Sequence, residues 1–274
     1  MAAIALKLEA LTLVFHAGTP NEVRALDGVD LELPRGTFAV VLGANGSGKS
    51  SLLDAIAGRL KHVTGRIFLD GREVTHRPEW RRAHLIGRVF QSPFSGTSAD
   101  LSIAENLALA ARRGGQRGLR LSLSPDRRQA IREKVASLGM GLEDRLDTPI
   151  GWLSGGQRQA LTVLMATIVR PSLLLLDEHT AALDPRSAEV VIKLTREIIT
   201  AGGLTTLMVT HSMAQAVQLG DRVLVMHRGR LVYDIPEARM HRLDQEDLLG
   251  LFDQLRWADR LDDPAAAMLR RGYR

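Results

Sequence analysis

The sequence predicts an α/β fold whose core is a parallel sheet. Three stretches predict it. An apolar run at 38–42 leads into a glycine-rich segment at 43–50 and then into a helical pattern at 51–57. The run 173–176 is four leucines, and 205–210 has the pattern of another buried strand. Such runs are typical of strands buried on both faces of a parallel sheet, where ligands bind beyond the strand ends.

Composition restricts the classes of protein that fit. The chain has 274 residues, of which 45% are hydrophobic, enough for the core of one large α/β domain or two small ones. No apolar stretch approaches the roughly 18 to 20 residues of a membrane-spanning helix, and we expect no export signal at the N-terminus. The absence of cysteine excludes disulfides, thiolate metal sites and cysteine catalysis.

The charge leaves two kinds of partner open. A net charge of +5 suits either nucleic acid or an anionic membrane surface. The 31 acidic residues are interspersed, however, and aromatic residues make up only 4%, so no stacking platform for bases is evident. A nucleotide-binding protein at a membrane surface accounts for the charge equally well.

The N-terminal region predicts extended structure. Alternating apolar residues favour a strand at 4–15, and an extended pattern resumes at 23–33 after a turn-forming run. Phe15 ends the first strand, upstream of the glycine-rich segment. Because an adenine ring gains from stacking on an aromatic side chain, Phe15 is a candidate base platform; core packing is the alternative.

The segment 43–50 has the G-x-x-x-x-G-K-S spacing of a phosphate-binding loop. Its glycines let successive backbone N–H groups converge on phosphate oxygens, and the following helix adds the positive end of its dipole. Lys49 would reach the β- and γ-phosphates, and the Ser50 hydroxyl would bind Mg²⁺. The alternative, an incidental glycine-rich turn, is disfavoured because a strand precedes the full motif and a helix follows it.

Beyond this loop, residues 66–74 predict a hairpin that turns at Asp70 and Gly71, and 85–90 predicts a short strand ending at Gln91. A glutamine there can present its amide to a metal or to an attacking water, although an ordinary strand-end glutamine is the alternative.

Residues 92–152 predict a helical insertion, with helices at 101–111 and 125–138. We interpret the basic stretch 112–120 between them as a solvated loop.

The core resumes at 153–157 with the sequence Leu-Ser-Gly-Gly-Gln, followed by an apolar helix that ends by 169. Ser154 suits a helix N-cap, and the glycines permit close backbone approach. This is a second helix N-terminus suited to phosphate.

Two carboxylates, Asp177 and Glu178, end the leucine-rich strand. Asp177 can hold Mg²⁺ directly or through a water, and Glu178 can orient the water that attacks a γ-phosphate. A merely solvated strand end is disfavoured by the four preceding leucines. A helix at 188–200 follows, and the next strand ends at His211, which can contact the γ-phosphate or be structural. Residues 222–233 predict a hairpin, and the C-terminal forty or so residues predict short amphipathic helices.

In this order the motifs resemble the ATP-binding-cassette ATPases over nearly all of residues 1–235. The Leu-Ser-Gly-Gly-Gln signature separates that family from other phosphate-loop proteins. The resemblance implies a P-loop NTPase cassette with a RecA-like parallel-sheet core, an N-terminal antiparallel β subdomain and a helical subdomain inserted at about 92–152. A C-terminal helical tail would occupy 236–274.

The resemblance also implies the site. Two cassettes would pair head to tail, so that each ATP lies between the phosphate loop of one and the signature of the other. Glu178 would be the catalytic base, His211 would sense the γ-phosphate, and Gln91 would serve the metal and the water. Mg²⁺ would be held by Ser50, Gln91 and Asp177. The residues implied at the ATP site are Phe15, Gly43, Asn45, Gly46, Ser47, Gly48, Lys49, Ser50, Ser51, Ser154, Gly155, Gly156, Gln157 and the dimer-bridging Asp184.

One residue departs from the family pattern. His179 stands where most transporters of the family have proline, and because Glu178 is present we expect hydrolysis to survive. The residues 178–185, with the stretch 18–22, resemble a bacterial subgroup associated with tryptophan- and tyrosine-type uptake.

These resemblances imply an ATPase subunit at the cytoplasmic face of the inner membrane. Its partners would be separate transmembrane permease subunits and an extracytoplasmic substrate-binding protein, with no nucleic acid. Residues 92–101 would meet a cytoplasmic helix of the permease. An amino-acid-type or related small-solute importer is favoured because the cassette is a separate polypeptide. The alternatives are an exporter subunit, a cassette protein acting on nucleic acid or ribosomes, and a regulatory ATP sensor.

Overall fold

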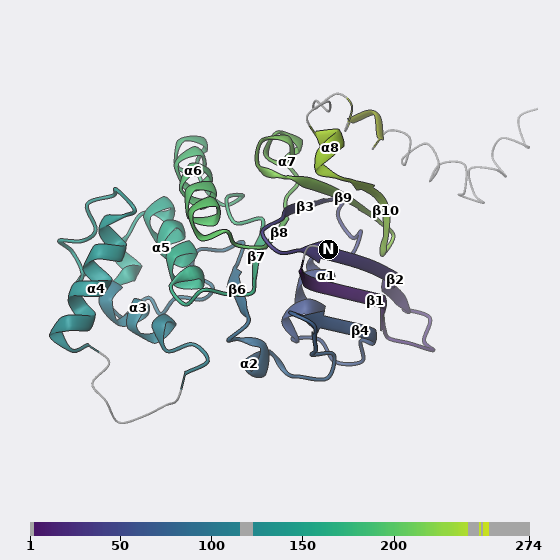
Figure 1. The fold of residues 1–274 in the computed structure, drawn as a ribbon, viewed down its shortest axis with the longest axis horizontal. Helices are drawn as coiled ribbons and strands as arrows, with labels where there is room; N and C mark the ends of the chain where they lie inside the picture. Colours follow the sequence, from purple (N-terminus) through teal and green to yellow (C-terminus); the bar gives the residue numbers. More distant parts are fainter. Residues whose placement is uncertain (1–2, 116–122, 241–246, 248, 252–274) are drawn as a thin grey trace, which may run out of the picture.

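The computed structural model describes residues 3–115, 123–240, 247 and 249–251. Figure 1 shows an antiparallel sheet at one end, helices α3 and α4 at the other, and a larger sheet between them. The antiparallel sheet has the order β2-β1-β4-β5. Its strands are β1 (Ile4–Phe15), β2 (Val23–Pro34), β4 (Thr64–Leu69) and β5 (Arg72–Glu73).

The larger sheet has the order β10-β9-β3-β8-β7-β6. All neighbouring strands in it pair in parallel except the edge strand β10, which is antiparallel to β9. The predicted α/β fold with a parallel core is therefore confirmed. The strands are β3 (Phe38–Leu42), β6 (Ile86–Val89), β7 (Leu173–Asp177), β8 (Thr206–Val209), β9 (Arg222–His227) and β10 (Arg230–Ile235).

Helices cover both faces of this sheet and form the end of the molecule opposite the antiparallel sheet. Within the described residues, the segment 92–152 contains helices and no strand of either sheet. The helices are α1 (Lys49–Ala57), α2 (Glu79–Arg82), α3 (Ile103–Ala111), α4 (Pro125–Ala136), the 3₁₀ turn η1 (Ile150–Trp152), α5 (Gly155–Thr167), α6 (Pro185–Gly202), α7 (Met213–Leu219) and α8 (Glu237–Met240).

The strand residues of the larger sheet are buried on both of its faces. Val41 and Leu175 pack in a cluster with α1 and the antiparallel sheet, whereas their neighbours Val40 and Leu174 pack in a second cluster with α6 and α7. This division follows from the period of two along a strand. A third cluster fills the space between α3, α4 and α5. The ends of these strands are therefore fixed in position by packing on both faces of the sheet.

The two predicted hairpins, β4–β5 and β9–β10, are both present in the structure. The geometry of each two-residue turn accounts for the glycine at its second position. Asp70 and Gly71 have φ values of 49° and 75°, and Arg228 and Gly229 have 45° and 79°. Two successive positive φ values are the requirement of a type I′ turn, whose twist matches the strands that it joins.

The basic stretch 112–120 is only partly the solvated loop that the sequence predicts. Arg113 is half-buried, and its guanidinium donates a hydrogen bond of 2.6 Å to the carbonyl of Val169 just beyond α5. The reason is that an arginine can reach back from the end of α3 to a carbonyl left free at a helix end. Residues 116–120 of the stretch lie outside the described part of the chain, as does most of the predicted C-terminal tail.

Among the described residues, no helix has both the length and the apolar character needed to cross a bilayer.

Candidate active site

Glycine is required at two positions of the loop between β3 and α1. Gly48 has a φ of 103°, and a Cβ added there would lie 2.3 Å from the carbonyl oxygen of Ala25. A Cβ on Gly43 would lie 2.5 Å from the carbonyl oxygen of Met226 and equally close to the Ser47 hydroxyl. The loop is therefore packed tightly against β2 and β9, which fixes its shape.

The turn of the β9–β10 hairpin supports the loop from behind. The N–H of Gly229 donates to the carbonyl of Ser47 at 3.0 Å, and the carbonyl of Gly229 accepts from the N–H of Asp27 at 2.9 Å. Arg230 adds an ion pair of 2.6 Å with the Asp27 carboxylate. Sequence reasoning found the Arg228-Gly229 turn but not this contact, because a turn signal carries no information about what the turn packs against.

The N-terminus of α1 is open to an anion. Its N-cap, Gly48, supplies no side-chain cap, and the first turn contains no acidic residue, whereas α3, α5, α6 and α7 all begin with a side-chain cap. The first N–H groups of α1 therefore face outward with the positive end of the dipole. The Ser47 hydroxyl is also buried and has no hydrogen-bond partner among the described residues. These features fit a bound phosphate oxygen.

Lys49 is buried in the same loop. Its Nζ atom donates to the carbonyls of Gly43 at 2.8 Å and Ala44 at 2.9 Å. Burial lowers the pKa of Lys49, while the charges of Glu178 and Asp177 oppose that shift. The ammonium is thus held beside the loop and the two carboxylates.

The remaining loop residues lie around this lysine. Asn45 and Gly46 are exposed at the tip, Ser50 is exposed on the first turn of α1, and Ser51 is half-buried.

Three strand ends converge on the carboxylate of Glu178. Its Oε1 atom lies 2.6 Å from Nε2 of His211 after β8, and its Oε2 atom accepts from the amide of Gln91 after β6 at 3.4 Å. The N–H of Glu178 donates to the carbonyl of Val209 at 2.9 Å. The φ of Glu178 is 42°, a conformation that is uncommon outside glycine and concentrates at functional sites. The structure therefore brings the three predicted catalytic residues together.

The turns after β7 and β8 are joined by a residue that sequence reasoning missed. The Thr210 hydroxyl donates to Oε1 of Gln215 at 2.8 Å, and the Gln215 amide donates to the Thr180 hydroxyl at 3.2 Å. Gln215 lies on α7, a helix of seven residues that the sequence analysis did not predict. Its short length gives little periodicity to detect.

Asp177 ends β7 beside these residues. Burial raises the pKa of its carboxyl group, and the neighbouring Arg88 opposes that shift. The donor atoms of Ser50, Gln91 and Asp177 are all oxygens, if the Gln91 amide turns its carbonyl inward, and Mg²⁺ prefers oxygen ligands. The described residues contain no group of three or more histidine, cysteine, aspartate or glutamate side chains placed to hold a metal. The three side-chain oxygens of Ser50, Gln91 and Asp177 are of the kind that suits Mg²⁺.

The signature residues form a second helix N-terminus. Ser154 caps α5, with its hydroxyl accepting from the Gln157 N–H and the Gln157 side chain accepting from the Ser154 N–H, both at 3.3 Å. This confirms the predicted N-cap. In the described part of the chain, no hydrogen bond links these residues to the phosphate loop.

The glycines of the signature permit α5 and α6 to meet. A Cβ on Gly156 would lie 3.0 Å from Cβ of Ser187, and one on Gly155 would lie 3.2 Å from Leu183. Asp184 caps α6 by accepting from the Ser187 N–H at 3.0 Å. The two capped helix N-termini are therefore neighbours.

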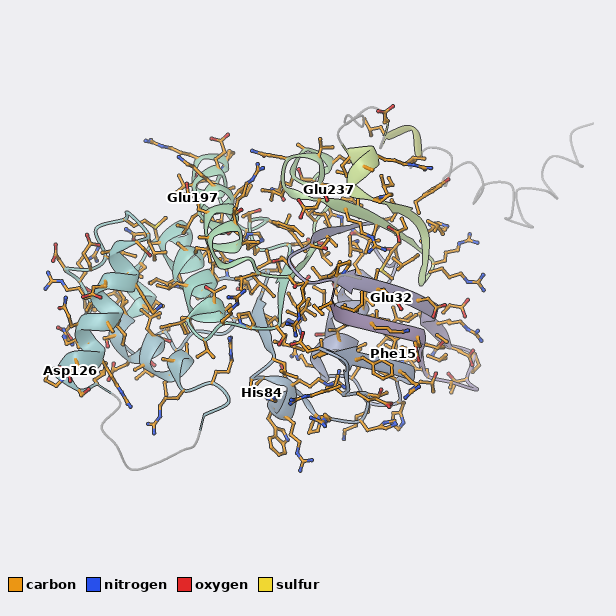
Figure 2. All side chains as sticks on the ribbon, in the orientation of Figure 1. Phe15, Glu32, His84, Asp126, Glu197 and Glu237 are labelled. Atoms are coloured by element: carbon orange, nitrogen blue, oxygen red, sulfur yellow. The ribbon has the colours of Figure 1, made fainter. Side chains whose placement is uncertain are left out.

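Phe15 stands apart from the core. It lies at the end of β1 opposite Val23, is 37% exposed, and belongs to none of the hydrophobic clusters among the described residues. Figure 2 shows it at the end of the molecule that carries the antiparallel sheet. Ala25, two residues beyond Val23, contacts Gly48. A flat exposed ring at this place suits stacking more than core packing.

His179 is buried behind Glu178. Its Nε2 atom lies 3.3 Å from the Thr195 hydroxyl, which donates its own proton to the Val191 carbonyl. The Nε2 atom therefore carries the hydrogen of the neutral ring, and Nδ1 has no partner among the described residues. Burial lowers the pKa of His179 to about 4. The hydrogen bond between His179 and Thr195 therefore connects the turn after β7 to α6.

The comparisons with known proteins agree with this geometry. A model of the ABC transporter family matches residues 26–181. The chain is 37% identical to a tyrosine transport ATP-binding protein of Clostridioides difficile, over 86% of this chain and 93% of that one. It is 38% identical to a lipoprotein-releasing system ATP-binding protein of Caulobacter vibrioides, over 81% and 92% respectively.

A solved dimeric ATP-binding cassette, in a post-hydrolysis state with ADP and Pi, superposes with a TM-score of 0.72. It is 26% identical, over 85% of this chain and 98% of that one. The phosphate loop, the signature helix and the carboxylate at the end of β7 thus occur in a fold shared with such cassettes. The chain belongs to the ABC transporter family, as an ATP-binding and ATP-hydrolysing subunit.

Proposed function

We propose that the hydrolytic centre is the Glu178 carboxylate with His211 and Gln91. The observation that carries the proposal is the convergence of these side chains at the ends of β7, β8 and β6. Glu178 accepts the proton of the attacking water, His211 contacts the γ-phosphate, and Gln91 orients the water. Lys49 and the N–H groups of the loop bind the β- and γ-phosphates, and Phe15 stacks on the adenine.

The same site is suited to a magnesium ion held by Ser50, Asp177 and Gln91 together with phosphate oxygens. When bound, the ion supplies positive charge to the phosphate oxygens. Around it, Lys49 adds a buried positive charge, and Ser47 offers a hydroxyl that has no other hydrogen-bond partner in the described part of the chain.

The complete site requires two cassettes. We propose a head-to-tail dimer in which Ser154, Gly155, Gly156 and Gln157 of one subunit contact the nucleotide bound at residues 43–51 of the other, with Asp184 at the interface. The dimeric cassette that resembles this chain supports the arrangement. The outward-facing, capped N-terminus of α5 supplies N–H groups for the partner's nucleotide.

The transporter is proposed to be an amino-acid-type importer. The cassette would act at the cytoplasmic face of the membrane on separate permease subunits, with an extracytoplasmic binding protein delivering the solute. The similarity to a tyrosine transport protein over most of both chains supports it. A comparable identity to a lipoprotein-releasing system ATP-binding protein, over somewhat less of this chain, makes an outward-acting system the second candidate.

The experiment is to tag the chain in its native cell, solubilise membranes gently and identify what co-purifies. A permease accompanied by an extracytoplasmic binding protein would support import. A permease without a binding protein, with lipoprotein bound, would favour the second candidate. Ribosomes or nucleic acid without a membrane partner would overturn the transporter proposal.

A further inference from the structure

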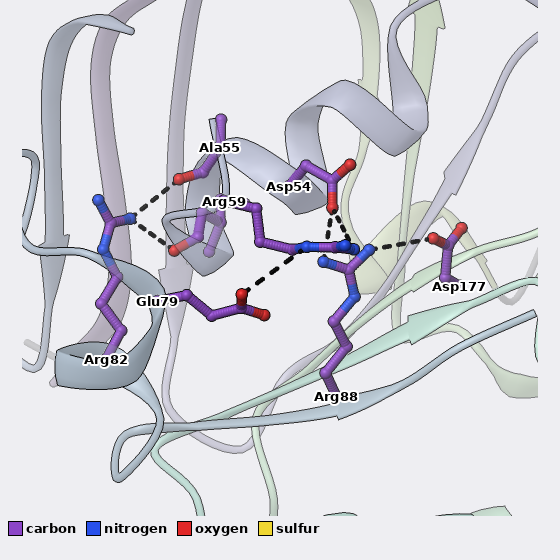
Figure 3. Close-up of polar contacts among 8 residues, drawn as sticks. Asp54, Ala55, Arg59, Glu79, Arg82, Arg88 and Asp177 are labelled. Atoms are coloured by element: carbon purple, nitrogen blue, oxygen red, sulfur yellow. Dashed lines mark hydrogen bonds and ion pairs between the residues drawn. The ribbon is translucent and has the colours of Figure 1, made fainter. Parts of the chain in front are cut away.

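Arg88 connects the helix after the phosphate loop to the carboxylate that ends β7. It lies on β6 opposite Leu175, and its side chain is only 9% exposed. Its Nη1 atom donates to Oδ1 of Asp54 on α1 at 2.6 Å, and its Nη2 atom lies 3.3 Å from Oδ2 of Asp177. Figure 3 shows the guanidinium between these two carboxylates. The ring of Phe90 lies beside it, with its centroid 4.7 Å away.

A second buried arginine shows how different this arrangement is. Arg82 donates to backbone carbonyls, among them those of Ala55 and Ile56 at the end of α1. That pattern is structural, because it satisfies carbonyls that the helix leaves free. Arg88 instead has two carboxylates as partners, and its Nε atom has no partner among the described residues. One of those carboxylates belongs to the proposed metal ligand.

The charge of Arg88 bears directly on that ligand. An arginine side chain stays protonated, so the guanidinium is a permanent positive charge in contact with Asp177. The Asp177 carboxylate has no other hydrogen bond or ion pair among the described residues. A divalent cation bound to Asp177 would compete with Arg88 for the negative charge of the carboxylate. The positive guanidinium would also repel the cation at short range in this partly buried site.

We propose that Arg88 is a positioning residue whose positive charge competes with the metal ion for the carboxylate of Asp177. Its charge lowers the affinity of the nucleotide-bound site for the divalent cation, which favours release of the cation with ADP after each turnover. Because Arg88 also contacts Asp54 on α1, it fixes the position of the Asp177 carboxylate relative to the helix that follows the phosphate loop. The inference rests on the proposed role of Asp177 as a metal ligand.

The test uses the full chain and two affinities for ADP, measured by calorimetry with Mg²⁺ and with EDTA. Their ratio reports the contribution of the metal, and effects on ADP alone cancel. Removing the charge in Arg88→Met should raise the ratio about tenfold, because one repulsive charge within a few ångströms is lost. Arg88→Lys keeps the charge and should stay within about threefold of the parent.

Arg59→Met is the matched control. Arg59 contacts the same Asp54 carboxylate at 3.4 Å, but its side chain is 45% exposed and it has no contact with Asp177. An exposed charge is screened, so its removal should leave the ratio within about twofold of the parent. If Arg88→Met does not fold, Arg88→Gln removes the charge, retains a donor for Asp54, and carries the same expectation.

An unchanged or lower ratio in the Arg88 variant without charge would overturn the inference. Equal increases in the Arg88 and Arg59 variants would also overturn it, because they would show a general effect of net charge. The variant Asp177→Asn distinguishes a failure of the inference about Arg88 from a failure of the proposed metal site. If that variant loses most of the metal contribution while Arg88→Met changes nothing, only the inference fails. If Asp177→Asn leaves the ratio unchanged, the metal assignment and the inference fail together.

Discussion

Nε2 of His211 lies 2.6 Å from Oε1 of Glu178, although 32 residues separate them in the chain. The contact follows from the parallel pairing of β7 with β8, in which Asp177 is opposite Val209. The residues that follow each strand must then emerge side by side. Because Gln91 donates to the other oxygen, both oxygen atoms of the Glu178 carboxylate are held by neighbouring side chains.

Glu178→Gln should retain nucleotide binding and lose hydrolysis. Glutamine keeps the shape of the side chain but cannot accept a proton, so kcat should fall about 100-fold to 10,000-fold while the Kd for ATP changes only a few-fold. Steady-state ATPase assays and calorimetry with the full chain measure the two quantities. Hydrolysis at the parent rate would show that another group is the base.

Lys49→Ala should act on binding instead. The buried ammonium donates to two carbonyls of the phosphate loop. Charged hydrogen bonds to phosphate contribute enough that ATP affinity should fall about tenfold to a hundredfold. Fluorescence titration with a labelled nucleotide measures the change. Normal affinity combined with lost turnover would assign Lys49 to catalysis alone.

Ser154→Ala should block ATP-dependent dimer formation while lowering the stability of the fold only slightly. The loss of one N-cap costs about 1 kcal/mol. Ser102 provides the matched control, because it forms the same capping box on α3, away from the signature. In a Glu178→Gln background, size exclusion with ATP should show dimers for Ser102→Ala and monomers for Ser154→Ala. Dimers in both would contradict the shared site.

Gly48→Ala should destabilise the fold more than Gly36→Ala does. Both glycines have positive φ, at 103° and 80°, so alanine is strained at either position. Only at Gly48 would the new Cβ collide with a backbone atom, the Ala25 carbonyl oxygen. We expect a loss of about 1 kcal/mol for Gly36→Ala and about 2 to 4 kcal/mol for Gly48→Ala in urea unfolding. Equal losses would show that the loop can move away from β2.

His179 should make the fold sensitive to mild acid. Burial lowers its pKa from 6.5 to about 4, so between these values the unfolded chain binds a proton that the folded chain excludes. The stabilising contribution is complete above pH 6.5 and is lost as the pH falls to 4, by up to about 3 kcal/mol. His179→Gln should flatten the dependence of the unfolding free energy on pH in this window. An unchanged slope would show that folding does not lower the pKa of His179.

The sequence predicted the features that depend on local pattern. The strand and helix around residues 43–50 and the turns at Asp70-Gly71 and Arg228-Gly229 lie where their own residues require them. The apolar run before Asp177 and Glu178 predicts a ligand site at the end of β7, whereas Gln91 and His211 are assigned to it through the family resemblance. The contacts of Glu178 with His211 and Gln91 depend on the strand order β8-β7-β6, which no local pattern predicts.

Other features could not be predicted because they depend on partners far away in the chain. The contacts of Arg88 with Asp54 and of Gln215 with Thr180 join elements that no local pattern relates. His179 was noticed as a departure from the family pattern, but its burial against Thr195 depends on where α6 packs. The same is true of Arg113, whose basic surroundings predict a solvated loop although its guanidinium donates to the Val169 carbonyl.

The hydrogen bond from Gly229 to the Ser47 carbonyl has a consequence for biosynthesis. A ribosome synthesises the chain from its N-terminus, so the phosphate loop emerges roughly 180 residues before the turn that supports it. Until the β9–β10 hairpin has been made, the carbonyl of Ser47 and the N–H of Asp27 lack their native partners. A nascent cassette would therefore acquire its ability to hold ATP late, when nearly the whole domain is available, and a chain that ends prematurely would not sequester nucleotide.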